Sequence, residues 1–218
     1  ILCVLILLIT NFIRASVYYV NSGEGEDTNS GRTPAEAWAS LEKVNAMVFQ
    51  PGDTILFKAG TPYQGQLEPK GSGSKLKPII IDKYDTGKRP AIHGQGLKQY
   101  TLLLQNIEYW EVRNLEITNR GEERTPGRRG VSILAENFGD CRHIVLDSLE
   151  IHEVNGSLVK SEGGGSAIWW KNSGDQVKTR FVGLVIQNCH IHHCERNGIN
   201  SNGYTRRDNW HPSQGVVI

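Results

Sequence analysis

Short runs in which apolar and polar residues alternate recur along the chain, separated by Gly and Asn. Three of them superpose without gaps, at residues 110–117, 144–151 and 184–191, and each reads apolar, any, apolar, any, Asn or Ser, apolar, any, Ile. Their spacings are 34 and 40 residues, so the connecting loops differ in length. A period of two residues is the period of a strand and argues against helices here. The pattern predicts stacked parallel coils of short strands.

A second strand is expected before each repeated run, at residues 102–106, 133–137 and 168–172, and each of these ends in Asn. The repeats therefore define two lines of polar residues, the first with Asn106, Asn137 and Asn172 and the second with Asn114, Ser148 and Asn188. Amides turned inward at tight bends can hydrogen-bond their own coil and the next one, about 4.8 Å away. We expect both lines to stack, as in a parallel solenoid.

The segment before the repeats has the pattern of a cap. Residues 33–45 can form one or two helical turns that present Trp38, Leu41 and Val44. Pro51-Gly52-Asp53 then turns into a strand at 54–58, and residues 78–82 and 89–92 fit the first complete coil. Because a solenoid needs its open end covered, we expect a short capping helix within residues 33–46.

Motifs in this N-terminal region carry a resemblance to a known family. They are Tyr18-Tyr19-Val20-Asn21, Gly31, Thr33-Pro34, Ala37-Trp38, Ser40-Leu41, Pro51-Gly52-Asp53 and Phe57-Lys58-Ala59-Gly60. The chain resembles secreted right-handed parallel β-helix proteins of the pectate-lyase-like superfamily, through these motifs in residues 17–95 and through the repeat pattern afterwards. The resemblance implies an all-β, right-handed parallel β-helix over residues 16–218, with its cap at about residues 17–60. It does not fix a reaction, because the superfamily contains lyases, hydrolases, esterases, epimerases and adhesive proteins.

Length and charge limit the classes of partner. The 218 residues suit one folding unit, and we expect a monomer. The formal net charge is +1, with 24 basic and 23 acidic residues, so no overall field would draw the protein to nucleic acid or to an anionic membrane. The 38% of hydrophobic residues is enough for a packed core and argues against disorder.

Both ends of the chain suggest further predictions. Residues 1–13 are almost wholly apolar, too few to span a bilayer, and precede Arg14-Ala15-Ser16, which predicts a partial signal peptide over residues 1–15. The protein is then expected to be secreted, periplasmic or at the cell surface, with no membrane span after cleavage; a buried N-terminal strand is the alternative. Residues 214–218 read as the start of an apolar strand with no partner, which suggests that further coils follow.

The cysteines give no disulfide framework, since removal of Cys3 with the signal peptide leaves Cys141, Cys189 and Cys194. Two of these lie in Cys-His-Ile-His-His-Cys, but structural zinc sites use closer ligand pairs, and we assign no metal site. The repeat also aligns two outward columns, one with Thr118, His152 and His192 and the other with Glu116, Glu150 and His190. Such columns can bind a metal or supply an acid and a base, although a solvated polar face is the simpler interpretation.

Three long loops mark a candidate cleft, at residues 119–129, 155–165 and 204–214. We expect them to emerge along the same edge of the stack, because each is predicted to follow the repeated strand and to precede the next one. The aromatic residues Trp169, Tyr204 and Trp210 can stack on sugar rings, with Trp170 turned into the core by alternation. Basic residues for binding acidic sugars are Arg196, Arg206 and Arg207. The predicted partner is a polysaccharide.

Two reactions and one non-catalytic function compete. A glycoside hydrolase needs two facing carboxyl groups, for which Glu162, Glu195 and Asp208 are available; Glu195 is the first choice for proton transfer, with Asp208 as its partner and His211 as an orienting donor. A lyase would use a base such as Lys171, next to Glu136 on the preceding coil, often with calcium, for which no tight Asp cluster is present. A non-catalytic carbohydrate-binding or adhesion protein needs only the aromatic groove. Hydrolysis is the favoured prediction.

Overall fold

The computed structural model describes residues 15–218 and contains three parallel sheets. The first sheet consists of β1 (Val17–Val20), β2 (Thr54–Lys58), β4 (Ile79–Tyr84), β7 (Trp110–Arg113), β10 (Asp140–Asp147) and β13 (Arg180–Gln187). The second consists of β3 (Pro62–Gln64), β5 (Ala91–His93), β8 (Glu116–Asn119), β11 (Glu150–Val154) and β14 (His190–Ile191). The third consists of β6 (Tyr100–Gln105), β9 (Arg129–Glu136), β12 (Ser166–Ser173) and β15 (Asn197–Asn202).

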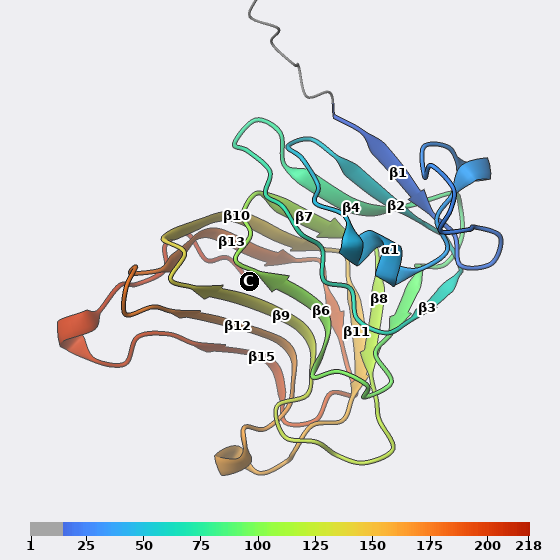
Figure 1. Cartoon of the computed structure of the whole chain (residues 1–218). Helices are drawn as coiled ribbons and strands as arrows, with labels where there is room; N and C mark the ends of the chain where they lie inside the picture. The colour runs from blue at the N-terminus through green and yellow to red at the C-terminus, as the bar shows by residue number, and fades with distance from the viewer. Residues whose placement is uncertain (1–14) are drawn as a thin grey trace, which may run out of the picture.

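From β4 onwards, each coil contributes one strand to each sheet. The chain runs β6, β7, β8, then β9, β10, β11, then β12, β13, β14, so that strands far apart in sequence lie side by side (Figure 1). The predicted repeat is confirmed in register: Ile144 lies opposite both Trp110 and Leu184, and Glu150 lies opposite both Glu116 and His190. The architecture is therefore all-β and resembles a β-helix.

The core lies between the three sheets and is built from aligned apolar side chains. Leu102, Val131 and Ile168 are paired along the third sheet and are fully buried. Val112 and Leu146 pair in the first sheet and are also fully buried. Because parallel strands in register place like residues on one face, the two-residue period alone creates these apolar columns.

One corner of the three coils that contain β7, β10 and β13 repeats the same turn. Asn114, Ser148 and Asn188 have φ values of 54°, 56° and 53°, a left-handed conformation that Asn tolerates better than most residues. Backbone hydrogen bonds join them to successive coils, from Asn114 N to Asp147 O and from Ser148 N to Gln187 O. The predicted line of these three residues is therefore confirmed.

The mechanism predicted for the Asn lines was partly wrong. Asn114 and Asn188 are not turned inward; their amides donate to carboxylates of the preceding coil, Asp82 at 2.8 Å and Asp147 at 2.9 Å. In the other line, Asn172 lies opposite Ala135 and not opposite Asn137. Asn137 sits two residues further on in a turn with φ of 49°, so position in the sequence run did not correspond to position in the coil.

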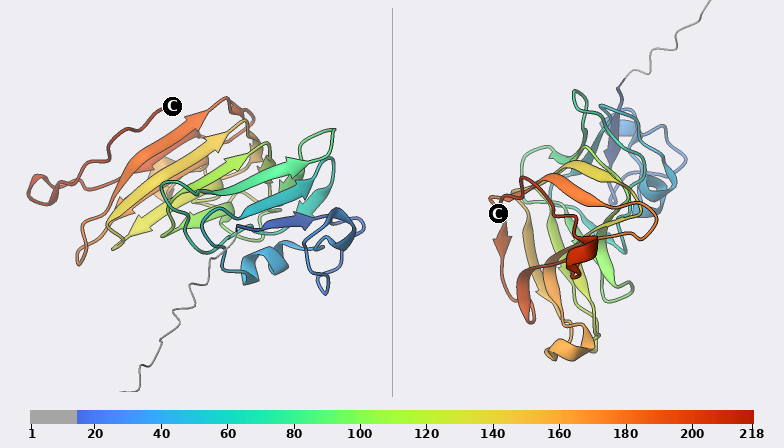
Figure 2. Two further views of the ribbon diagram at one scale, coloured as in Figure 1. Left: turned by 90° about the horizontal axis from the view of Figure 1, so that it is seen from above. Right: turned by 90° about the vertical axis from the view of Figure 1, so that its left-hand side faces the viewer.

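The N-terminal segment covers one end of the core, as predicted (Figure 2). It contains the 3-10 turn η1 (Pro34–Glu36) and the helix α1 (Leu41–Ala46), which begins after Ser40, whose hydroxyl accepts a hydrogen bond from Lys43 N. Trp38, Leu41 and Val44 are buried in the core. Residues 1–14, where the signal peptide is predicted, lie outside the described residues.

Two further observations concern the chain ends and membranes. The segment expected to lack a partner lies along β13, with Val217 opposite Val185 and Val217 N donating to Leu184 O at 3.0 Å. The segment therefore has a partner in the preceding coil, and the expectation that further coils follow stays a prediction. Among residues 15–218, no helix has the length and apolar character needed to cross a bilayer.

Candidate functional site

The long loops lie at two different ends of the third sheet. Residues 120–128 and 155–165 connect the second sheet to the start of β9 and β12, and the turn η2 (Lys160–Glu162) belongs to them. Residues 203–213 instead follow the end of β15 and contain the turn η3 (Arg207–Asn209). Figure 1 shows η2 at the bottom and η3 at the far left. The prediction that all three loops share one edge was wrong, because residues 197–202 form a strand of their own.

This separation removes the predicted partnership of Glu195 with Asp208 and His211. Glu195 precedes the six-residue strand β15 and Asp208 follows it. At roughly 3.3 Å per residue, the strand alone separates them by about 20 Å. The Asp208 carboxylate is paired with Arg206 in its own loop, and His211 lies against Tyr204, with ring centroids 6.5 Å apart.

The remaining residues predicted in this loop line a hollow at the end of the stack. Trp170, Asn172, Tyr204, Trp210 and His211 are among the residues that line its volume of about 280 Å³. Trp170 packs against the core, as alternation predicted, so the hollow opens onto the end of the core. The Tyr204 hydroxyl donates to Gly174 O at 3.1 Å and accepts from Thr179 N at 2.9 Å, which ties the loop to the preceding coil.

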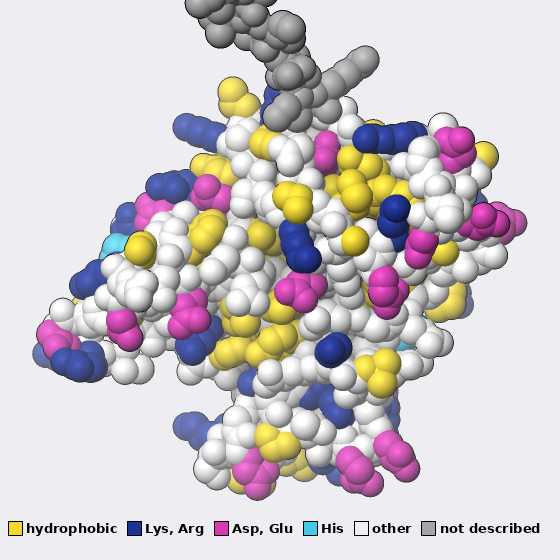
Figure 3. Space-filling model, in the orientation of Figure 1, with side chains coloured by type: hydrophobic (Ala, Val, Ile, Leu, Met, Phe, Trp, Pro, Cys, Tyr) yellow, Lys and Arg dark blue, Asp and Glu magenta, His cyan; other side chains and the backbone are white. Residues whose placement is uncertain are grey.

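The outer face of the third sheet carries an aromatic and cationic platform, formed by Tyr100, Arg129 and Trp169. Trp169 points outward, as predicted, and its ring lies 6.4 Å from the Tyr100 ring. The Arg129 guanidinium lies over the Trp169 ring, 5.2 Å from its centroid, and Trp169 Nε1 donates to Asn202 Oδ1 at 2.6 Å. Figure 3 shows hydrophobic side chains gathered on this face, with charged groups around them. The ring is thus fixed by contacts on two sides.

Arg129 also fastens the glycine-rich loop to the platform. Its guanidinium donates to Gly163 O at 2.9 Å and to Gly164 O at 3.3 Å. Burial lowers the pKa of Arg129 from its usual value, and the neighbouring Tyr100 opposes that shift. Carbonyl oxygens stabilise the buried charge in place of water. Glu162, which directly precedes Gly163, is consequently held beside the platform, with its carboxylate accepting from Ser157 Oγ at 2.5 Å.

The third side of the platform is the turn before β15. Both carboxylate oxygens of Glu195 are engaged by Arg124, with Arg124 Nε at 2.9 Å from Oε2 and Nη2 at 2.9 Å from Oε1. Arg196 contacts the glycine-rich loop, and its Nη1 donates to Leu158 O at 3.4 Å. The structure therefore brings together Glu162, Glu195, Arg196 and Trp169 from the predicted set. It separates them from the residues of the 203–213 loop.

Lys171 lies two residues beyond Trp169 and is exposed. The register of β12 and β9 places Leu134 opposite Lys171, and Ser173 opposite Glu136. The predicted pairing of Lys171 with Glu136 was therefore wrong by two positions.

Tyr100 was not predicted as a site residue, and Arg129 was included only as the last residue of the predicted cleft loop at residues 119–129. A signal for them was present, because the repeat already aligned the strand starts, and Tyr100 lies opposite Arg129 in the structure. Both residues precede the apolar runs that drew attention to the strands, so the pattern alone treated them as loop residues.

The two outward columns predicted on the second sheet are confirmed. Thr118 lies opposite His152, and Glu150 lies opposite Glu116 and His190. His152 stacks on His192 with ring centroids 4.8 Å apart. Within residues 15–218, one group of three potential metal ligands is formed, by Glu150, His190 and His192. Two imidazoles do not suit calcium, which takes oxygen ligands.

The chain resembles known proteins both in sequence and in structure. The chain is similar to lacto-N-biosidases. It is 29% identical over 87% of its length to a lacto-N-biosidase of Bifidobacterium longum subsp. longum, of which it covers 16%. The native crystal structure of a GH136 lacto-N-biosidase from Eubacterium ramulus matches with a TM-score of 0.81 and 26% identity, over 93% of this chain and 40% of that one.

A shorter match and a negative result complete the comparisons. The chain is 31% identical to an alpha-1,3-galactosidase A of Akkermansia muciniphila over 36% of its length and 13% of that protein's. No family model matches the chain. The sequence and structural relatives are glycoside hydrolases that act on glycans, which supports the hydrolase prediction and gives no support to a lyase. The chain spans well under half the length of the lacto-N-biosidases it matches.

Proposed function

We propose that this chain belongs to an exported glycoside hydrolase and binds a glycan on the outer face of β6, β9, β12 and β15. The single observation that carries the proposal is the Trp169 ring, fixed on an outward sheet face by Arg129 and Asn202. An aromatic face offers apolar area to a sugar ring at a low entropic cost when it is already held in place. Similarity to lacto-N-biosidases over most of the chain supports the assignment to hydrolases. The apolar segment at residues 1–13 supports export.

The substrate class proposed is a glycan that contains lacto-N-biose, the unit in the name of the relatives. Arg129 and Arg196 flank the platform and already donate to carbonyl oxygens of the glycine-rich loop, Gly163 O and Leu158 O; a guanidinium has five N–H donors and a carbonyl oxygen two lone pairs, so both kinds of group can make a further hydrogen bond. Neutral sugars carry hydroxyl groups that both donate and accept, so a mixed rim of this kind suits them.

Glu162 and Glu195 are the proposed carboxyl pair for hydrolysis. They come from adjacent loops at the same edge of the platform, and two carboxyl groups are what most glycosidases require. The Arg124 guanidinium balances the charge of Glu195, and Ser157 donates to Glu162. Asp208 is no longer proposed, because it lies beyond the far end of β15.

The test combines binding and turnover on a panel of glycans with and without lacto-N-biose. Trp169→Ala should weaken binding about 30-fold, the loss expected for a Trp anchor worth ~2 kcal/mol. Trp210→Ala is the matched control, since Trp210 is 66% exposed and lies in the 203–213 loop. Equal binding by the two variants would place the glycan elsewhere.

A non-catalytic glycan-binding protein is the second candidate. The observation that favours it is that Arg124 engages both oxygens of Glu195, leaving that carboxylate no free oxygen in this arrangement. Release of reducing ends separates the two candidates. If the protein is a hydrolase, it should release reducing ends from the glycan. Glu162→Gln and Glu195→Gln should each abolish this release without changing the affinity for the glycan. If the wild-type protein binds the glycan without releasing reducing ends, and both variants bind it equally well, the protein is a non-catalytic glycan-binding protein.

A further inference from the structure

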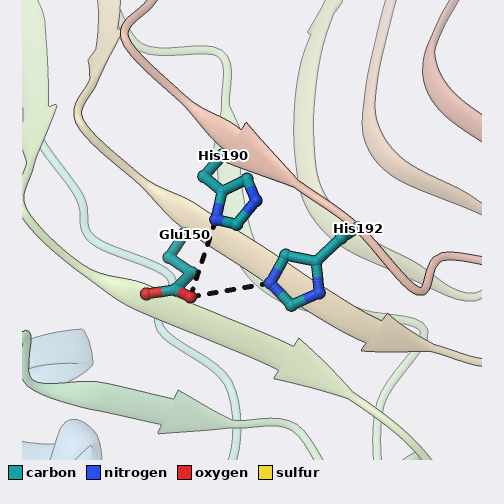
Figure 4. A group of neighbouring side chains, drawn as sticks. All are labelled: Glu150, His190 and His192. Carbon is teal, nitrogen blue, oxygen red and sulfur yellow. Dashed lines mark ion pairs between the residues drawn. The ribbon is translucent and has the colours of Figure 1, made fainter.

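Three potential metal ligands converge on the outer face of the second sheet, away from the glycan platform. Glu150 begins β11 and lies opposite His190, which begins β14. His192 lies two residues after His190, and residues two apart on an extended chain point to the same side. Figure 4 shows both imidazoles directed at one oxygen of the Glu150 carboxylate.

The spacing of the ligand atoms suits a single ion. Glu150 Oε1 lies 3.8 Å from His190 Nδ1 and 3.5 Å from His192 Nε2. An ion with tetrahedral bonds of about 2.0–2.1 Å holds its ligand atoms about 3.3 Å apart. We propose that Glu150, His190 and His192 bind a divalent transition-metal ion, for which Zn²⁺ is the probe, with water as the remaining ligand. This proposal is independent of the proposed glycan hydrolysis.

Neighbouring groups orient two of the ligands. His192 Nδ1 and His193 Nδ1 are 2.7 Å apart, so one of them carries the proton of a hydrogen bond. If His192 Nε2 binds the ion, His192 Nδ1 is the donor and His193 accepts, which fixes both tautomers. Arg89 Nη1 contacts Glu150 Oε2 at 3.3 Å and leaves Oε1 to face the imidazoles. His152 supports the His192 ring by stacking on it.

The coil before provides a natural comparison. His152 Nε2 lies 3.1 Å from Glu116 Oε1, as His192 lies near Glu150, but the position equivalent to His190 is occupied there by Glu150 itself. One imidazole and one carboxylate make a simple hydrogen-bonded pair. The three-ligand group arises only where His190 adds a second imidazole, within the part of the chain that the structure describes.

The flanking thiols do not join the cluster. Cys194 Sγ faces the carbonyl oxygens of His192 at 3.2 Å and Ile151 at 3.7 Å. Cys189 Sγ likewise faces Gln187 O at 3.2 Å. Neither thiol belongs to the group of converging ligand atoms, which consists of Glu150, His190 and His192. The ligand set is therefore two nitrogens and one oxygen, which suits Zn²⁺, Co²⁺, Ni²⁺ or Cu²⁺ and not Ca²⁺.

The experiment measures Zn²⁺ affinity of the untagged chain by competition with a chromophoric indicator. Wild-type protein is expected to bind one Zn²⁺ and to give visible d–d absorption bands with Co²⁺. His190→Gln and Glu150→Gln should each weaken binding about tenfold or more. His143→Gln is the matched control, because it removes an imidazole that pairs with Glu111 at 2.7 Å and lies outside the cluster. It should bind as wild type does.

His190→Gln is the cleanest variant, since the His190 side chain is 69% exposed and its replacement leaves the core untouched. Circular dichroism of the metal-free proteins checks that every variant is folded. The proposal is overturned if His190→Gln binds Zn²⁺ as tightly as wild type, if His143→Gln loses as much affinity as His190→Gln, or if Ca²⁺ competes for the site at similar concentrations.

Discussion

Asn119 gives the sharpest test of how the candidate site is held together, because the loop at residues 120–128, beside the platform, leaves the second sheet directly after it. Its side chain is fully buried. The amide nitrogen donates to Arg129 O at 2.8 Å and, at 3.3 Å, to the carbonyl oxygens of Lys98 and Gln99, while Oδ1 accepts from Gly96 N at 3.0 Å. One side chain thus joins the end of β8 to the start of β9.

The loss of stability expected for Asn119→Ala follows from the two shortest of these hydrogen bonds. Asn119→Ala leaves the buried Arg129 carbonyl and the Gly96 amide without this partner, at about 1–3 kcal/mol for each group. Taking ~1.5 kcal/mol for each gives ~3 kcal/mol of lost stability. For a domain of this size, that corresponds to a fall in Tm of roughly 6–12 °C.

Urea denaturation followed by circular dichroism measures the change. Asn209→Ala is the matched control, since within residues 15–218 the Asn209 side chain makes no hydrogen bond, and it should change stability by less than about 0.5 kcal/mol. Asn119→Asp should cost at least as much as Asn119→Ala, because it keeps the acceptor but loses the donors and buries a charge. If Asn119→Ala and Asn209→Ala unfold at the same urea concentration, the hydrogen bonds contribute nothing and the reasoning fails.

Three further predictions concern the core, the repeated corner and the loop ion pair. Burial raises the pKa of the Cys141 thiol to about 12. The contribution of the buried neutral thiol to the free energy of unfolding should therefore be complete below pH ~9 and be lost as the pH rises toward 12. Alkylation mapped by mass spectrometry should spare this thiol until urea unfolds the protein. Ser148→Val, at φ of 56°, should cost about 1–2 kcal/mol in urea denaturation, whereas Ser148→Asn should be tolerated; equal costs would contradict the turn argument. Glu195→Gln should lower stability by less than about 1 kcal/mol, since Arg124 is largely exposed, and a larger fall in Tm would make Glu195 a structural residue.

The fold was largely predictable because parallel stacking repeats a local pattern. The alignment of Trp110, Ile144 and Leu184 in the sequence is the alignment of strands in the first sheet. The cap was predictable from Leu41 and Val44, whose spacing is that of a buried helical face; Trp38 is also buried, but it precedes α1 and forms a bridge with Val20, so its place on a helical turn was wrong. Handedness is not contained in such a pattern, which would be the same for either hand.

The candidate site was less predictable, because it depends on which corner each loop occupies. Short polar strands such as Asn197–Asn202 lack the apolar alternation that marks the others, so the sequence pattern does not indicate a strand there. This one omission moved Asp208 and His211 to the wrong end of the sheet. The contact of Arg129 with Trp169 joins residues 40 apart in sequence, and no local pattern specifies such a pair.

The contrast between the corners of each coil has an evolutionary consequence. The corner at Asn114, Ser148 and Asn188 always has the same two-residue connection, so an insertion there would displace every strand that follows in its coil. The corner at residues 120–128 and 155–165 already accepts loops of different lengths without changing the register of β9 and β12. Insertions and deletions in related genes should therefore accumulate at this corner, beside the proposed glycan-binding platform, while the stack beneath stays the same.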